Sequence, residues 1–166
     1  MLLSDNQPFL HFLDMEPRAE MGLLLFQVES RICALPVSSV GETMRPLPVA
    51  PIPKTPDFVL GAALVRGVPI PIVCTGALLS GTPCADGRRW ITVRAAADRW
   101  VGLQVSAVIG VFPVESFELN RLPPLLDGSG AVEKLGRHDR ELLAVLDPGR
   151  VVPADVFARI SELPED

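Results

Sequence analysis

The sequence has few of the residues that enzymes most often use for catalysis and metal binding. Its 166 residues include two histidines and three cysteines, and no two cysteines have the close spacing of a zinc site. His11 lies in an irregular N-terminal region, and His138 lies in a predicted turn between two strands. Cys33 and Cys74 lie inside apolar segments, where a free cysteine is usually a small core residue. The composition therefore predicts a protein that is not an enzyme and holds no metal or cofactor.

The sequence also lacks a block of basic residues and a long apolar run. Fifteen basic and 20 acidic residues give a net charge of −5, which would repel a phosphate backbone or an anionic bilayer on average. The longest apolar run, 58–65, is well short of the roughly 20 residues of a membrane-spanning helix. Residues 1–17 do not have the pattern of a secretory signal, and three cysteines cannot all pair within one chain. These absences exclude nucleic-acid binding and membrane insertion, and they predict a cytoplasmic location.

Proline, in contrast, is abundant. Seventeen prolines disfavour a mostly helical fold, because an interior proline removes a backbone donor and clashes with the preceding turn. Short runs of Val, Ile and Leu that end in Gly, Pro, Asp or Ser are typical of strands joined by tight turns. The predicted strands are 23–28, 31–37, 58–65, 68–73, 90–94 and 100–114, a helical turn is predicted at 74–80, and residues 38–44 fit either a helical turn or a strand. Pro69 and Pro71 withhold donors from the same neighbour, so 68–73 is predicted to be an edge or bulged strand.

The two halves of the chain resemble each other. A shift of 68 positions (99 − 31) superposes five residues on identical residues: Arg31 on Arg99, Leu35 on Leu103, Val37 on Val105, Ser38 on Ser106, and Val40 on Val108. Matching segments are expected to share a local conformation. The sequence therefore predicts a domain over 21–160 made of two similar strand modules, roughly 21–88 and 89–160. Residues 1–20 are predicted to be a weakly structured lead-in, and 161–166 a tail.

A short helix is predicted near the C-terminal end. Asp147 can accept from the first free backbone donors, and Pro148 is tolerated at a first helical position. Four apolar residues then recur at helical spacing, and Pro153 breaks or kinks the pattern: Val152, Val156, Phe157 and Ile160. This helix is expected to pack on the strands.

Arg66 is the charged residue that stands out, because it lies between two apolar strands and is followed by Gly67. One interpretation is a turn arginine that binds nearby carbonyl groups. The other is a planar guanidinium that is presented to a carboxylate or carbonyl group of another protein. Since the chain offers few catalytic groups, binding through surfaces is the default function.

The order of these segments resembles the CheW-like coupling proteins of bacterial chemotaxis arrays. The likeness runs from about Met21 to Ile160, and its most specific part is the sequence Gly-x-x-x-x-Arg-Gly at 61–67, followed by the proline-containing strand Val68–Val73. The resemblance implies a mainly β fold of two small five-stranded barrels around a shared apolar core, with short helices. It also implies a non-enzymatic adaptor that links chemoreceptor tips to the regulatory domain of a CheA-type histidine kinase.

The resemblance assigns binding roles to several positions. Val40, Gly61 and Arg66 match positions associated with kinase binding. Val105, Ala107 and Val108 match a strand associated with receptor binding. The implied location is cytoplasmic, at the inner face of the membrane through the receptors.

The chain departs from the family pattern at several polar positions. Leu64 stands where the family usually has Asn, Ser106 replaces a common Asp, and Cys74 and Gly76 replace residues of the segment after the proline-containing strand. Each change removes a polar group that could fix a turn or meet a partner. These departures favour an accessory array, for example one for surface sensing or pilus motility.

Two other functions remain open from sequence. One is a small thiol enzyme or ligand-binding module that uses Cys74 or Cys84 with His138. The other is a chain that has lost one partner surface and only caps or inhibits an array.

Overall fold

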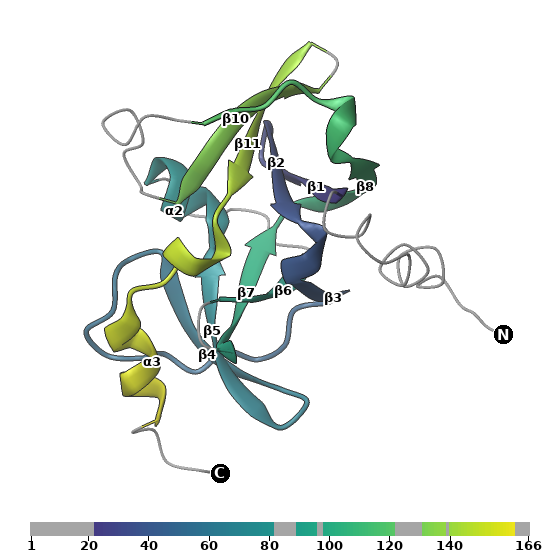
Figure 1. The fold of residues 1–166 in the computed structure, drawn as a ribbon. Helices are drawn as coiled ribbons and strands as arrows, with labels where there is room; N and C mark the ends of the chain where they lie inside the picture. Colours follow the sequence, from purple (N-terminus) through teal and green to yellow (C-terminus); the bar gives the residue numbers. More distant parts are fainter. Residues whose placement is uncertain (1–21, 82–88, 96–97, 122–130, 139, 162–166) are drawn as a thin grey trace, which may run out of the picture.

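The described chain consists of two β-sheets with a few short helices (Figure 1). A computed structural model describes residues 22–81, 89–95, 98–121, 131–138 and 140–161, apart from the side chains of Arg121, His138 and Ser161. Its strands are β1 (Gly22–Val28), β2 (Arg31–Pro36), β3 (Val40–Met44), β4 (Val59–Val65), β5 (Val68–Cys74), β6 (Arg89–Arg94), β7 (Trp100–Val105), β8 (Ala107–Pro113), β9 (Asn120–Arg121), β10 (Val132–His138) and β11 (Glu141–Leu146). Most of the predicted strands are confirmed, and segment 38–44 combines both alternatives, because the 3₁₀ turn η2 (Val37–Ser39) precedes β3.

The strands form a six-stranded and a five-stranded sheet. The six-stranded sheet has the order β8-β1-β2-β11-β10-β9, and the five-stranded sheet has the order β3-β6-β7-β5-β4. Each sheet contains one parallel pair, β2 with β11 and β5 with β7. The mainly β fold is confirmed. The extra strand of the larger sheet is β9, which is two residues long.

Each sheet draws strands from both halves of the chain. The first hairpin, β1–β2, belongs to the six-stranded sheet, but the next strand, β3, pairs with β6 in the other sheet. In the same way β6–β7 belongs to the five-stranded sheet, and β8 crosses to pair with β1. The predicted single strand 100–114 is therefore two strands that separate at Ser106. The sequence repeat corresponds to this shared crossing, because the shift of 68 places β2 and β3 on β7 and β8.

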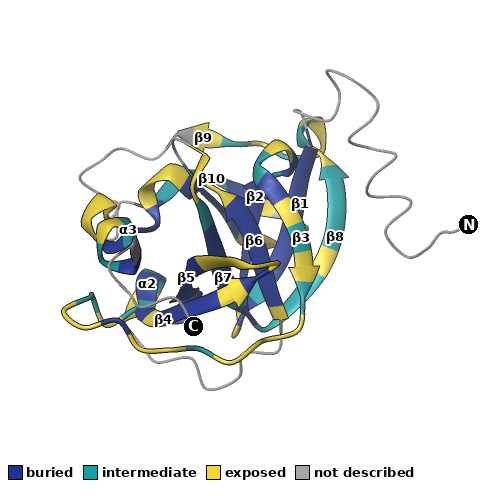
Figure 2. Ribbon diagram, turned by 90° about the horizontal axis from the view of Figure 1, so that it is seen from below, coloured by how far each residue is buried: buried dark blue, intermediate teal, exposed yellow. Residues whose placement is uncertain are grey.

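Three apolar clusters fill the fold. One lies on the outer side of the six-stranded sheet and includes Leu25, Ile32 and Leu143. A second belongs to the five-stranded sheet and includes Trp90 and Ile72. The largest cluster joins the two sheets and draws residues from both of them and from the C-terminal helix. In Figure 2 the buried colour is concentrated on the strands, and the helices show exposed outer faces. A shared core between two sheet-based units is thus present.

Pro69 and Pro71 do not lie on an edge strand, which corrects the edge alternative predicted for 68–73. The pairing of β5 with β4 does contain an irregularity, a register shift between Val59 and Gly61. β5 lies between β4 and β7. The parallel pairing of β5 with β7 is registered from Ile72 to Cys74, after both prolines. The two prolines, which lack a backbone N–H, therefore lie in the part of β5 that precedes its parallel pairing with β7. An interior strand can tolerate prolines in such a stretch.

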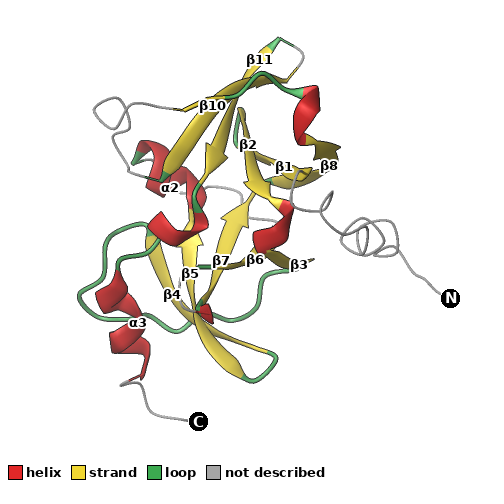
Figure 3. Cartoon of the chain, in the orientation of Figure 1, coloured by secondary structure: helices red, strands yellow, loops and turns green. Residues whose placement is uncertain are grey.

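In the described part of the chain, the α-helices α2 and α3 lie beside the strands in Figure 3. Helix α2 (Thr75–Ser80) begins directly after β5. The predicted C-terminal helix is confirmed as α3 (Ala154–Ser161), which contributes Val156 and Ile160 to the large core. Asp147 caps the preceding 3₁₀ turn η6 (Pro148–Arg150), where its side chain accepts the N–H of Gly149 at 3.0 Å.

Candidate functional site

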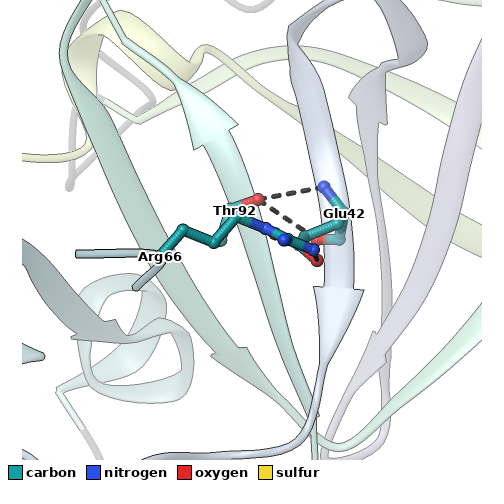
Figure 4. A network of polar contacts seen from close by, with 3 residues as sticks. All are labelled: Glu42, Arg66 and Thr92. Atoms are coloured by element: carbon teal, nitrogen blue, oxygen red, sulfur yellow. Dashed lines mark hydrogen bonds and ion pairs between the residues drawn. The ribbon is translucent and has the colours of Figure 1, made fainter. Parts of the chain in front are cut away.

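Arg66 forms an ion pair across the open side of the five-stranded sheet (Figure 4). It lies in the β4–β5 turn with φ +52° and is followed by Gly67 with φ +83°. Its guanidinium donates through Nε and Nη2 to the two carboxylate oxygens of Glu42, at 2.7 and 2.9 Å. Glu42 lies on β3, so this two-pronged contact joins the two edge elements of the sheet. Because the Arg66 side chain is 78% exposed, its remaining donors face solvent.

A threonine on the neighbouring strand fixes the backbone of Glu42. The hydroxyl of Thr92, which is 4% exposed, accepts the Glu42 N–H at 2.9 Å and donates to the Glu42 carbonyl oxygen at 3.3 Å. The register between β3 and β6 shifts between Val40 and Glu42, and these bonds satisfy the backbone groups at the irregularity. The backbone of Glu42 is therefore held by Thr92 independently of the contact between its side chain and Arg66. No local sequence pattern links Glu42 to Arg66, which is 24 residues away.

An apolar pocket opens beside this ion pair. It has a volume of about 470 Å³ and is lined by Gly41, Glu42, Val65, Arg66, Val68, Ile70, Thr92 and Trp100. Gly41 makes room for the indole of Trp100, because a Cβ at this position would come within 2.7 Å of the ring. The pocket thus combines aliphatic walls and an aromatic ring with one charged corner. This composition suits an apolar side chain flanked by a polar group.

The ion pair should make stability depend on the charge of Glu42. The hydrogen bond from Arg66, helped by its positive charge and opposed by partial burial, lowers the pKa of Glu42. A carboxylate with a lowered folded-state pKa stabilises the fold above its unfolded-state pKa, and this contribution is lost as the pH falls through the folded-state value. We expect the unfolding free energy of wild-type protein to fall more steeply between about pH 5 and about pH 3 than that of Glu42→Gln.

Urea unfolding at a series of pH values would measure this difference. Glu118→Gln is a matched control, because the contact of Glu118 with Arg137 is 3.9 Å long and both side chains are largely exposed. Parallel pH profiles for wild type and Glu42→Gln would contradict the assignment.

The other residues predicted for kinase binding are buried. Val40 is 7% exposed and belongs to the large core. Gly61 is buried on β4 with φ +145°, beside Ala50. Ala50 belongs to the proline-rich connector 46–56, which joins β3 to β4. Ala50 and Ala62 exchange two backbone hydrogen bonds of 2.8 Å, so that the proline-rich connector adds one bridge to the edge of β4. Neither Val40 nor Gly61 is among the residues that line the pocket beside Arg66.

The residues predicted for receptor binding lie at the start of β8 and just before it. Val105 is 2% exposed, whereas Ala107 and Val108 are half-buried. The Ser106 hydroxyl accepts a hydrogen bond from the Glu29 N–H at 2.9 Å. The backbone N–H of Ser106 donates to the Gln27 carbonyl oxygen at 2.9 Å. Ser106 thus ties the crossing to the β1–β2 turn. Ala107 and Val108 lie on the edge strand of the six-stranded sheet, apart from Arg66.

The thiol residues considered from sequence show no catalytic arrangement in the described part of the chain. Burial raises the pKa of the Cys33 thiol to about 12. Cys74 is 1% exposed and disulfide-bonded, and Cys84, His11 and the side chain of His138 lie outside the described residues. Within the described ranges, no group of three or more His, Cys, Asp or Glu side chains is placed to hold a metal ion. Those ranges also contain no helix with the length and apolar character to span a membrane.

Comparisons with known proteins give one consistent result. A family model described as the CheW-like domain matches residues 22–156. The chain is 27% identical over 134 residues to the chemotaxis protein CheW of Thermotoga maritima, covering 80% of this chain and 88% of the relative. It is 27% identical over 121 residues to protein FrzA of Myxococcus xanthus, with coverage of 72% and 74%.

A solved structure has a similar fold. It is the scaffolding protein TtCheW from Thermoanaerobacter tengcongensis, with a TM-score of 0.66 and 23% identity, covering 77% of this chain and 89% of that one.

Proposed function

The chain belongs to the CheW-like domain family, and we propose that it is a non-enzymatic adaptor that couples chemoreceptors to a CheA-type histidine kinase in chemotaxis-like signalling. The observation that carries this proposal is the family match over residues 22–156, which takes in both sheets and the start of α3. The relatives named CheW are chemotaxis proteins, and the structural relative is titled a scaffolding protein.

A binding assay with cognate fragments tests the proposal directly. The purified full chain would be presented to the regulatory domain of a histidine kinase and to a chemoreceptor cytoplasmic fragment from the same organism. We expect both fragments to bind with dissociation constants of about 1–50 µM, typical of a transient signalling interface. Retention of neither fragment at tens of micromolar would overturn the adaptor function.

For the kinase, we propose the surface around Arg66 and the adjoining apolar pocket. Val40 and Gly61 are both buried. In this proposal they support kinase binding indirectly, by maintaining the conformation of β3 and β4. Arg66 is the exposed member, and its donors that do not bind Glu42 are available to a carboxylate or carbonyl group of the partner. This surface contains the two features, an arginine and an aromatic ring, that are enriched in binding hot spots.

Arg66→Ala should weaken kinase binding by about tenfold and change the melting temperature little. The binding loss follows from removing a directed donor at an interface, whereas an exposed ion pair contributes little to folding. Isothermal calorimetry and thermal melts would measure the two effects on the same preparation. Arg45→Ala is the control, because Arg45 is also exposed and follows β3. Equal affinities for Arg66→Ala and wild type would remove Arg66 from the interface.

For the receptor, we propose the β8 side of the six-stranded sheet. Val108 is half-buried and Ile109 is 42% exposed, so β8 presents apolar side chains, and among the described residues it is an edge strand of its sheet. Val105 supports the strand from the core. The location we propose is the cytoplasmic face of a receptor array.

The departures from the family pattern support an accessory array. Leu64 is 57% exposed beside the Arg66 turn, so the Asn-to-Leu change places an apolar group on the proposed kinase surface. Similarity to FrzA of Myxococcus xanthus shows that CheW-like chains are not limited to proteins named CheW. We propose surface sensing or pilus motility as the output of the array.

A further inference from the structure

The apolar pocket beside Arg66 continues into a second hollow beside α3. This second hollow has a volume of about 380 Å³, and its lining comes from the start of β5, from the end of the β6–β7 turn and from α3. The two hollows share three lining residues, Val68, Ile70 and Trp100. They therefore form one groove that runs from β3 to α3, which we call the arginine groove.

Two arginines of the β6–β7 hairpin pack on aromatic rings of this groove. The Arg94 Cζ lies 5.3 Å from the centre of the Trp100 ring, and the Arg99 Cζ lies 4.9 Å from the centre of the Phe157 ring. Both arginines are exposed. An arginine that packs on a ring through the face of its guanidinium keeps the N–H groups at the edge for other partners.

These two arginines lack the acidic partner that Arg66 has. No ion pair within the described ranges includes Arg94 or Arg99. The carboxylates that line the groove are those of Glu42, which Arg66 already binds, and Asp98, which is exposed. Three arginines thus face two carboxylates, so the groove has a positive charge although the whole chain has a net charge of −5.

The apolar walls of the groove are also open to solvent. Val68 is 52% exposed, and Trp100 and Phe157 are half-buried. An exposed apolar patch with a charged rim is typical of a protein-binding surface. Because Val68 and Trp100 line both hollows, a complementary segment would place one apolar side chain on each side of them.

Resting on the proposed binding of the kinase at the Arg66 surface, we propose that the bound kinase segment is acidic and apolar. It carries two large apolar side chains, one for each hollow, and carboxylates that bind Arg94 and Arg99. Both hollows have volumes typical of binding pockets, and the unpaired guanidiniums favour an acidic complement over a basic one. The groove thereby extends the kinase surface from Arg66 to α3.

Charge removal tests the acidic part of this proposal. Arg94→Gln/Arg99→Gln should weaken the binding of the kinase regulatory domain by about tenfold, and the remaining affinity should depend less on salt between about 0.05 M and about 0.5 M NaCl. Arg31→Gln/Arg137→Gln is the matched control, because it removes two exposed arginines from the six-stranded sheet. Its kinase affinity and salt dependence should equal those of wild type. Thermal melts of both variants would show that the fold is retained.

A measurement on the unaltered sequence tests the location. The chain has two tryptophans, so fluorotryptophan labelling gives two ¹⁹F signals, which Trp90→Phe assigns. The Trp100 signal should shift when the unlabelled kinase domain is added, because the bound segment replaces water beside the ring. The Trp90 signal should move less, since Trp90 is fully buried.

The possible failures are distinguishable. If the kinase domain binds wild type and Arg94→Gln/Arg99→Gln equally well, the acidic segment is wrong and the adaptor function stands. If the chemoreceptor fragment shifts the Trp100 signal and the kinase domain does not, the groove belongs to the receptor and the inference is overturned. If neither fragment binds wild type, the inference fails together with the proposed function.

Discussion

Replacing Trp90 by alanine should lower the free energy of unfolding by about 4 kcal/mol. Trp90 is fully buried on β6, in the core of the five-stranded sheet. Its indole Nε1–H donates to the side-chain oxygen of Gln104 at 2.9 Å. The substitution removes the largest buried side chain of this cluster, leaves a cavity, and leaves the Gln104 oxygen without its donor.

Trp90→Ala should also weaken kinase binding. Trp90 packs in the same cluster as Val65, Ile70 and Trp100, and these three residues line the pocket beside Arg66. Urea unfolding followed by circular dichroism measures the effect. Trp90→Phe is the matched control, since it keeps an aromatic ring in the core, loses the indole donor and leaves a smaller cavity than alanine, and it should cost about 2 kcal/mol. A loss below about 1 kcal/mol for Trp90→Ala would contradict the packing described here.

Gly61→Asp should destabilise the fold by about 3 kcal/mol or more and weaken kinase binding through that change. The backbone of Gly61 has φ +145°, which side-chain-bearing residues rarely adopt. A Cβ there would collide with the backbone oxygen of Ala50 and come within 2.7 Å of Val49 Cγ1. Strain and overpacking therefore act together, each at about 1–3 kcal/mol.

Gly67→Ala separates the two causes. Gly67 also has a positive φ, +83°, but a Cβ there would meet nothing within 4 Å. This variant should cost about 1 kcal/mol from strain alone. Unfolding free energies and kinase affinities measured on Gly61→Asp and Gly67→Ala distinguish the effect of backbone strain from that of overpacking. If Gly61→Asp were as stable as wild type and still lost kinase binding, Gly61 would contact the kinase itself.

Local sequence signals were sufficient for most of the elements. The β1–β2 and β4–β5 hairpins and α3 were predicted because each is encoded by neighbouring residues: an apolar run, a turn pair such as Arg66-Gly67, or an apolar helix face. The cap at Asp147 belongs to η6 and not to α3. The edge position predicted for the two prolines of β5 was wrong, because prolines on an edge strand and prolines in the part of an interior strand before its parallel ladder give the same sequence pattern.

The candidate site could be predicted only in part. Arg66 stood out because a charged residue between two apolar runs is visible locally. Glu42 and Thr92 were missed, because their roles arise from the irregular pairing of β3 with β6. The positions taken from the family resemblance proved to be of two kinds, buried supports such as Val40 and exposed groups such as Arg66, and burial depends on packing that a residue's neighbours in sequence do not specify.

The sequence by itself determined a mainly β protein with an internal repeat, because alternation, turn residues and proline act over a few residues. Only the tertiary structure decided that the repeat marks a crossing of strands between two sheets, and that Arg66 pairs with Glu42. Strand pairing and ion pairs join residues that are distant along the chain, and many such pairings are compatible with one local pattern. Packing of all strands around the shared core selects among them.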